Sequence, residues 1–188
     1  MISDTRRKII NLLQKDGRIK FSELGRILGI SHVAVKKHIN KMVKEDLLNI
    51  SAYLNPKKLN AKLIIVLSEV ESESLDRFVR IFSRCPRVVF FFTATGVYNL
   101  IVLFLVENED MMKIIAVGVC CIRSMPGIRK SEVYVLEDII YPKYFPIRII
   151  ADRKSDTTPC GLKCENCKYY VGGKCLACPA TKYYRGPL

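Results

Sequence analysis

The stretch FSELGRILGISHVAVKKHINKMVK, Phe21 to Lys44, determines the fold of the N-terminal part of the chain. Its apolar residues recur every three or four positions on either side of Gly29, which predicts two short helices joined by a tight turn. The second helix begins after Ser31, a residue type that caps helix N-termini. Its inward face consists of Val35, Ile39 and Met42. This pattern predicts a helix-turn-helix, whose second helix fits the major groove of DNA.

The outward face of this second helix carries the candidate DNA contacts. Side chains in its first two turns are best placed to meet base edges, and cationic side chains farther along are placed to meet phosphates. A solvated surface charge is the alternative interpretation for each lysine. The candidates are Ser31, His32, Val33, Lys36, Lys37, Asn40 and Lys41.

A further helix precedes this pair and an extended segment follows it. Ser3 can cap the first helix, which ends at the turn around Gly17. The apolar stripe of that helix consists of Ile9, Ile10, Leu12 and Leu13. Residues 47–54 are strand-like, and the following Asn-Pro-Lys-Lys predicts a turn or hinge.

The middle of the chain predicts a second folding pattern, in the order βαββαβ. The strands are expected at residues 61–70, 88–93, 98–106 and 131–136, and the helices at residues 75–82 and 110–124. This order is typical of the ferredoxin-like arrangement, an antiparallel sheet with two helices on one face. The fold class is therefore α+β, and the open face of the sheet is free to pair with a second copy.

Five of the eight cysteines lie in the last 29 residues, spaced as Cys160-x3-Cys164-x2-Cys167-x7-Cys175-x2-Cys178. Two Cys-x2-Cys turns can close a tetrahedral shell around zinc, which predicts the last four as ligands and a small metal-stabilised module. The fifth, Cys160, favours the alternative of an iron–sulfur cluster. A metal that only replaces a missing core is a third interpretation. Cys85 is expected to be a small buried residue, and Cys120 and Cys121 to pack in a core or interface.

Composition limits the classes of protein. The chain has 188 residues, 49% of them hydrophobic, and a formal charge of +13. No apolar run approaches the roughly 20 residues of a membrane span, and the N-terminus has no signal-peptide pattern, so a cytoplasmic protein without membrane association is expected. Disulfides are disfavoured in that reducing compartment. The first 50 residues carry eleven Lys and Arg against five Asp and Glu, which favours a nucleic-acid partner.

Four spaced motifs occur in order between residues 3 and 140: DGRIKFSELGRILGIS, YLNPKKLN, TGVYNLIVLF and SMPGIRKSEVYVLED. Together they resemble the Lrp/AsnC family of transcription regulators in its archaeal style. The resemblance implies palindromic DNA sites and a C-terminal domain that dimerises through its sheet and assembles further into tetramers or octamers. It also implies amino-acid effectors bound between subunits, near Thr95, Gly96, Tyr98 and Asn99. Many relatives carry Asp where this chain has Asn99, so one charge for an effector's ammonium group is missing.

The expected domains are a helix-turn-helix (residues 1–50), a hinge (51–60), a dimerisation and effector domain (61–140), a linker (141–159) and the cysteine-rich module (160–188). The expected function is sequence-specific regulation of transcription, tuned by an effector or by the state of a bound metal. An architectural protein that coats DNA with little sequence preference is the alternative. An iron–sulfur redox enzyme is disfavoured, because no catalytic constellation is evident and no glycine-rich phosphate loop is present.

Overall fold

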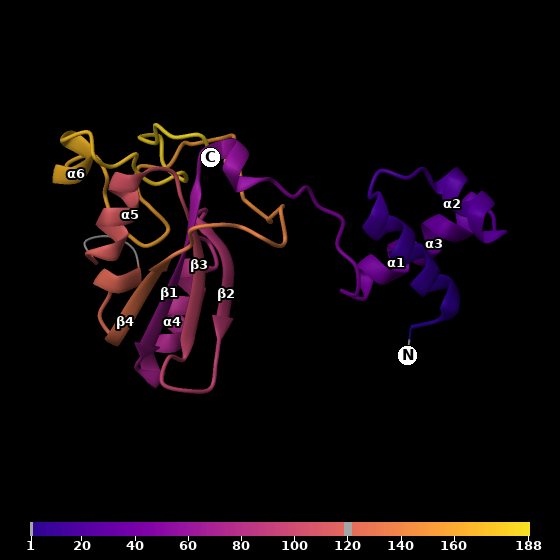
Figure 1. Cartoon of the computed structure of the whole chain (residues 1–188), viewed down its shortest axis with the longest axis horizontal. Helices are drawn as coiled ribbons and strands as arrows, with labels where there is room; N and C mark the ends of the chain where they lie inside the picture. The colour runs from indigo at the N-terminus through magenta and orange to yellow at the C-terminus, as the bar shows by residue number, and fades with distance from the viewer. Residues whose placement is uncertain (1, 119–121) are drawn as a thin grey trace. The chain divides into compact units, whose positions relative to one another are not determined.

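A computed structural model describes residues 2–118 and 122–188 of the chain, so Cys120 and Cys121 lie outside the described residues. The chain forms two compact units, Met1–Ala52 and Tyr53–Leu188 (Figure 1). No helix in the described ranges is both long enough and apolar enough to span a bilayer.

The N-terminal unit is a bundle of three short helices around one apolar core. They are α1 (Asp4–Lys15), α2 (Phe21–Leu28) and α3 (His32–Lys44). The core consists of Ile9, Leu13, Leu24, Val35, Ile39 and Met42. The predicted helix-turn-helix is confirmed, including the inward face of α3. Ser3 occupies the N-cap position of α1, but its side chain makes no capping hydrogen bond.

Two glycines shape the turn between α2 and α3. Gly29 ends α2 with a φ of 67°, a left-handed conformation that glycine adopts without strain. Gly25 lies inside α2, directly beneath the start of α3. A Cβ atom at this position would lie 2.6 Å from the carbonyl oxygen of Ile30. The absence of a side chain at Gly25 therefore lets the two helices approach closely.

The prediction of a strand at residues 47–54 was wrong. Only Leu54 forms a bridge, in which its N–H donates to the carbonyl of Phe145 at 2.8 Å and its carbonyl accepts from Phe145 at 2.9 Å. The other residues of this segment have no neighbouring strand with which to form a ladder. The turn that follows is a short 3-10 helix, η1 (Pro56–Leu59).

The second unit contains a four-stranded antiparallel sheet, as predicted. We call residues 53–140 of this unit the sheet unit and residues 141–188 the tail. The strands are β1 (Lys62–Val70), β2 (Val88–Thr93), β3 (Leu100–Val106) and β4 (Ile128–Val135), in the order β2-β3-β1-β4. The helices are α4 (Ser72–Phe82), α5 (Glu109–Ala116), the short η2 (Ile122–Ser124) and α6 (Lys168–Val171). Helix α5 ends earlier than expected, because Val117 and Gly118 leave the helical pattern, with Gly118 at a φ of 78°.

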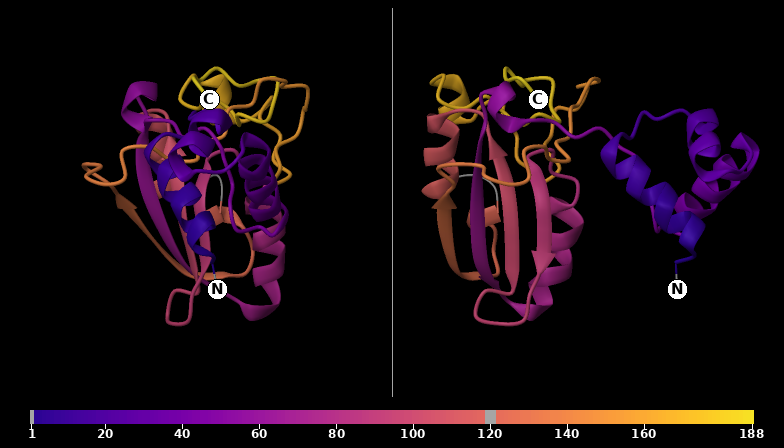
Figure 2. Two further views of the ribbon diagram at one scale, coloured as in Figure 1. Left: turned by 90° about the vertical axis from the view of Figure 1, so that its right-hand side faces the viewer. Right: turned by 45° about the vertical axis from the view of Figure 1, so that its right-hand side comes forward.

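Helices α4 and α5 cover one face of the sheet (Figure 2). The alternation of side chains along a strand sends Ile64 and Val66 of β1 and Phe104 of β3 to this face. There they pack against Phe78 and Phe82 of α4, and all of these side chains are almost completely buried. This core fixes the positions of the loops at both ends of the sheet.

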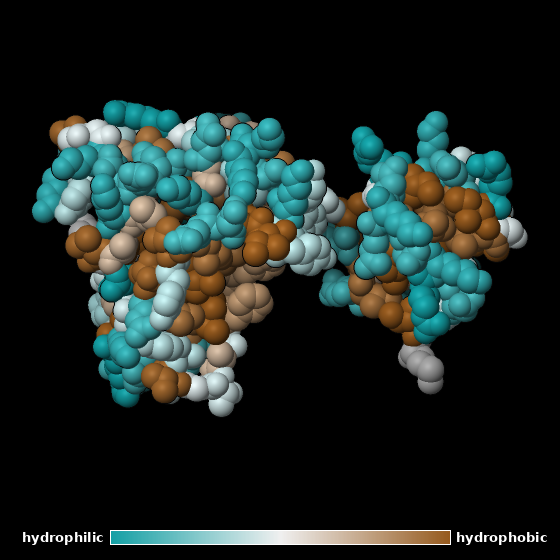
Figure 3. All heavy atoms as spheres, in the orientation of Figure 1, coloured by the Kyte–Doolittle hydropathy of each residue, from teal (hydrophilic) through white to brown (hydrophobic). Residues whose placement is uncertain are grey.

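The C-terminal segment packs against one end of the sheet's opposite face. Phe145, Ile147, Tyr184 and Leu188 are buried there together with Leu63, Val89 and Leu105 of the sheet. Residues that were expected to form a linker thus contribute to a core. The rest of this face stays open, and hydrophobic side chains gather over the strands in Figure 3.

The close approach at Gly25 yields a stability prediction. Gly25→Ala should lower the free energy of unfolding of the N-terminal unit by about 1–3 kcal/mol, because the new methyl group would force α2 and α3 apart. Gly17→Ala is the matched control, because its Cβ would have no neighbour nearer than 3.8 Å. Urea unfolding followed by circular dichroism measures both, and equal effects would contradict this packing.

Candidate functional site

Helix α3 presents all of the predicted DNA contacts to solvent. The hydroxyl of Ser31 accepts a hydrogen bond from the backbone N–H of Ala34 at 3.1 Å, which fixes the N-terminus of the helix. The seven predicted residues, Ser31, His32, Val33, Lys36, Lys37, Asn40 and Lys41, are all exposed. Val33 is 62% exposed, and an apolar side chain at this position suits contact with a thymine methyl group.

The lysines of α3 differ in their surroundings. Lys41 lies 3.8 Å from Glu45, which also accepts a hydrogen bond from Arg6 at 2.8 Å. Within the part of the chain that the structure describes, no ion pair involves Lys36 or Lys37. Their charges are therefore not neutralised within the unit and are available to an anionic partner.

The predicted effector loop connects β2 to β3, and its residues have separate environments. The side-chain amide of Asn99 accepts from the N–H of Val70 at 2.8 Å and donates to the carbonyl of Val70 at 2.7 Å. Asn99 and Gly96 line a cavity of about 280 Å³. Its other lining residues are Glu69, Val70, Glu71, Ser72, Val97 and Arg129. Thr95 is exposed outside this lining, so the four predicted residues do not converge on one cavity.

Tyr98 contacts β4 instead. Its hydroxyl donates to Glu132, and the hydroxyl of Tyr134 donates to the same carboxylate at 2.7 Å. These two hydrogen bonds, together with Lys130, lower the pKa of Glu132 to about 2. The carboxylate therefore stays charged at neutral pH and anchors the loop through Tyr98.

The cysteines of the tail lie beside the helices of the sheet unit. Cys160, Cys164, Cys175 and Cys178 line a cavity of about 60 Å³, to which α4, α5 and the residues between α4 and β2 also contribute. Cys167 is not part of this lining. In the described ranges, no three His, Cys, Asp or Glu side chains form a group that could hold a single metal ion. Zinc binding by the tail stays a prediction.

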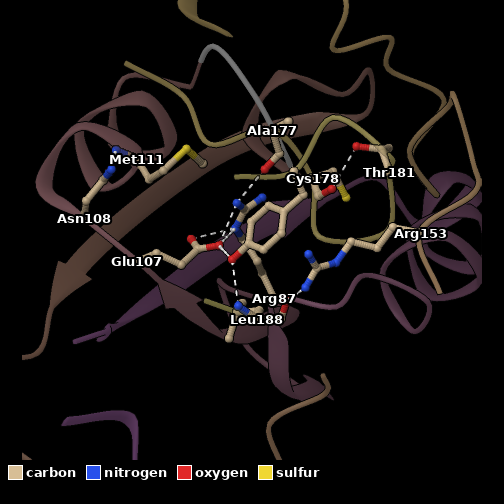
Figure 4. Close-up of polar contacts among 10 residues, drawn as sticks. Arg87, Glu107, Asn108, Met111, Arg153, Ala177, Cys178, Thr181 and Leu188 are labelled. Atoms are coloured by element: carbon tan, nitrogen blue, oxygen red, sulfur yellow. Dashed lines mark hydrogen bonds and ion pairs between the residues drawn. The ribbon is translucent and has the colours of Figure 1, made fainter. Parts of the chain in front are cut away.

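A buried ion pair between Arg87 and Glu107 was not anticipated from the sequence (Figure 4). The guanidinium donates to the carboxylate through Nε at 2.9 Å and Nη2 at 2.8 Å, and only 9% and 0% of the two side chains are exposed. Nη2 also donates to the carbonyl of Ala177 at 2.6 Å. The hydroxyl of Tyr184 donates to Glu107 at 2.8 Å and accepts from the N–H of Leu188 at 3.0 Å. The tail thus completes the hydrogen bonding of a charge pair in the sheet unit.

One signal in the sequence could have revealed this pair. Arg87 directly precedes β2 and Glu107 directly follows β3, and the two strands are antiparallel neighbours. Charged residues at the matched ends of an antiparallel pair lie side by side. Nothing in the sequence indicated that the tail would cover them.

The comparisons with known proteins agree with these features. Residues 2–49 match a family model described as winged helix-turn-helix DNA-binding. An uncharacterized HTH-type transcriptional regulator of Pyrococcus abyssi is 23% identical over 142 residues, which cover 74% of this chain and 95% of the relative. The structure of E. coli AsnC matches with a TM-score of 0.64 and 15% identity, covering 74% of this chain and 95% of AsnC. This chain has the Lrp/AsnC fold.

A second solved structure shows the same fold with a ligand. It is a transcriptional regulator from Neisseria meningitidis in complex with L-Met, which matches with a TM-score of 0.66 and 16% identity and covers 76% of this chain and 94% of that protein. These proteins are matched over nearly all of their own length but over only about three quarters of this chain.

The hydroxyl of Tyr184 generates a stability prediction. Tyr184→Phe should lower the free energy of unfolding of the sheet unit by about 1–3 kcal/mol, because it removes one donor from the buried Glu107 and leaves the N–H of Leu188 without its acceptor. Tyr183→Phe is the control, because its hydroxyl donates to Asp156 at 3.2 Å on the exposed surface. Equal losses in urea unfolding would mean that the buried network is not stabilising.

Proposed function

We propose that this chain is a sequence-specific DNA-binding regulator of transcription. The observation that carries the proposal is the exposed, cationic face of α3 in a helix-turn-helix unit that matches a DNA-binding family model. The N-terminal turns of α3 enter the major groove, where Val33 meets base edges and Lys36 and Lys37 meet bases or phosphates. The regulator acts on DNA in the cytoplasm, and its work is binding rather than catalysis.

The regulator acts as a dimer or a larger assembly of dimers. Residues that pair directly across neighbouring strands point to the same face of the sheet. On the open face, Ile65 of β1 pairs with Leu103 of β3 and with Tyr134 of β4. On this face, Phe92 is 54% exposed and Tyr134 is 50% exposed. Large apolar side chains that gather on one surface favour association. Pairing of two such faces buries them and provides two copies of α3 for a palindromic DNA site.

An amino acid is the effector that the cavity at the β2–β3 loop suits best. The cavity walls carry both signs of charge, since Arg129 lies 3.9 Å from Glu69 and 3.7 Å from Glu71. An amino acid carries both an ammonium and a carboxylate group, so each of its charges finds an opposite one. Because the amide of Asn99 is bonded to the backbone of Val70, the glutamates and not Asn99 hold the ammonium group. The L-Met bound by the Neisseria meningitidis protein of the same fold supports an effector of this class.

We also propose that the cysteines of the tail bind a metal. Thiolates are ligands for zinc and for iron–sulfur clusters, and four of the tail cysteines line one cavity. The metal is a second input to the regulator, separate from the effector cavity.

Substitution of the lysines on α3 tests the DNA-binding proposal. Lys36→Ala and Lys37→Ala should each weaken binding to a DNA site selected from a random pool by about tenfold. Each phosphate contact that is lost should also reduce the slope of log affinity against log salt concentration by about one. Lys15→Ala, at the end of α1, is the control and should bind like the parent. Fluorescence anisotropy at several salt concentrations measures this. If selection enriches no sequence, the architectural alternative holds.

Phe92→Glu tests the dimer. A charge at this position should convert the assembly to monomers, because it would be buried without a partner when two sheet faces meet. Val171→Glu is the control, because Val171 is 72% exposed but lies on α6 in the tail. Sedimentation velocity should show a smaller species for Phe92→Glu only. A parent protein that is monomeric at micromolar concentration would overturn the proposed assembly.

A further inference from the structure

Five cysteines from two distant parts of the sequence line one cavity. Four belong to the tail, and the fifth is Cys85, which follows α4 and precedes β2 in the sheet unit. The cavity has a volume of about 60 Å³. Its cysteines are Cys85, Cys160, Cys164, Cys175 and Cys178. Cys85 therefore belongs to the same site as the tail cysteines, although 75 positions separate it from Cys160.

One of these cysteines has a polar side chain beside its sulfur. The sulfur of Cys160 lies 3.1 Å from the hydroxyl of Thr158, which also accepts from the backbone N–H of Leu162 at 2.8 Å. This contact sets Cys160 apart from Cys85, Cys164, Cys175 and Cys178.

Apart from the cysteines, the cavity wall is apolar except for Thr158 and Arg87. Phe82, Met111, Ile115 and Leu162 contribute apolar surface. Arg87 also lines the cavity, and its contacts with Glu107 and Ala177 fix its guanidinium there. A centre with four thiolate ligands is anionic and costly to bury, and Arg87 offsets only a part of that cost because its charge is already paired with Glu107.

We propose that this cavity binds an iron–sulfur cluster whose ligands are Cys85, Cys164, Cys175 and Cys178. These are the cavity cysteines that remain when Cys160, whose sulfur contacts the hydroxyl of Thr158, is set aside. The proposal rests on metal binding by the tail and does not depend on DNA binding.

The arrangement of the sulfurs favours a cluster over a single zinc ion. Tetrahedral zinc requires its sulfurs to converge at about 2.3 Å from one point. In the described residues no three such ligands form a single-ion group, yet five cysteines surround one cavity. A cluster places its metal atoms between the ligands and so holds the thiolates farther apart.

The role of Cys85 distinguishes this site from a zinc site confined to the tail. A tail site built from two Cys-x2-Cys turns needs Cys167 and spares Cys85, whereas the cavity includes Cys85 and omits Cys167. With Cys85 as a ligand, the metal joins the tail to the sheet unit next to the C-terminal end of α4. Loss of the metal would then loosen the tail from this end of the sheet.

The test compares Cys85→Ser with Cys167→Ser in the full chain. Each protein is purified without oxygen, incubated with ferrous iron and sulfide, and assayed for iron, acid-labile sulfide and visible absorption. The parent and Cys167→Ser should bind equal amounts of iron and sulfide and show broad absorption near 400 nm. Cys85→Ser should bind at least about tenfold less iron per chain than the parent. A parallel incubation with zinc alone measures how much zinc each protein binds, which is the competing interpretation.

Three outcomes would overturn the proposal: a colourless parent with one zinc per chain, loss of iron in Cys167→Ser, or full iron in Cys85→Ser. Alkylation of the iron-loaded parent keeps the test decisive if Cys85→Ser does not fold. Cys167 should react with iodoacetamide without loss of colour, and protection of Cys167 by the metal would contradict the ligand set. DNA binding by the same samples reports separately on the helix-turn-helix.

Discussion

The ion pair between Arg87 and Glu107 is the interaction on which the second unit depends. Burial of two charges costs several kcal/mol unless nearly all of their hydrogen-bonding groups have partners. Among the described residues before position 141, the two side chains hydrogen-bond to each other and to no other residue. Ala177 and Tyr184 of the tail supply the remaining contacts. The tail therefore cannot leave this position without exposing or stranding a charge, and it behaves as part of the fold.

This dependence explains how a cysteine-rich segment with little apolar surface of its own acquires a fixed position. Arg87 donates to the carbonyl of Ala177, which lies between Cys175 and Cys178 and has a φ of 62°. Arg148 adds a second attachment by donating to the carbonyls of Ser83 at 2.8 Å and Cys85 at 2.6 Å. The tail cysteines are thus set against Cys85 by contacts that involve no metal, so the cavity does not depend on a metal for its shape.

The sequence predicted the features that depend on local periodicity. The helix that contains the apolar spacing of α3 and the strand expected at residues 61–70 each depend on neighbours within a few residues, and both were confirmed. The strand at residues 47–54 failed because a strand needs a partner, and only Leu54 finds one, in Phe145. The cavity that includes Cys85 could not be predicted for the same reason, because Cys85 and the tail cysteines are far apart in the sequence and meet only in the folded chain. The predicted effector loop joins β2 to β3, but the separation of the Tyr98 and Asn99 side chains depends on hydrogen bonds to β4 and β1, which the sequence does not show.

The two candidate sites of the second unit lie at opposite ends of one hairpin. The loop from Thr95 to Asn99 joins β2 to β3 beside the effector cavity, whereas Arg87 and Glu107 stand at the open end of the same two strands beside the cysteines. A movement of this hairpin would change both ends together, because β2 and β3 are paired from Val88 to Thr93, with one register shift between Val88 and Phe90. Effector and metal can therefore be coupled without direct contact, if each favours a different position of this hairpin.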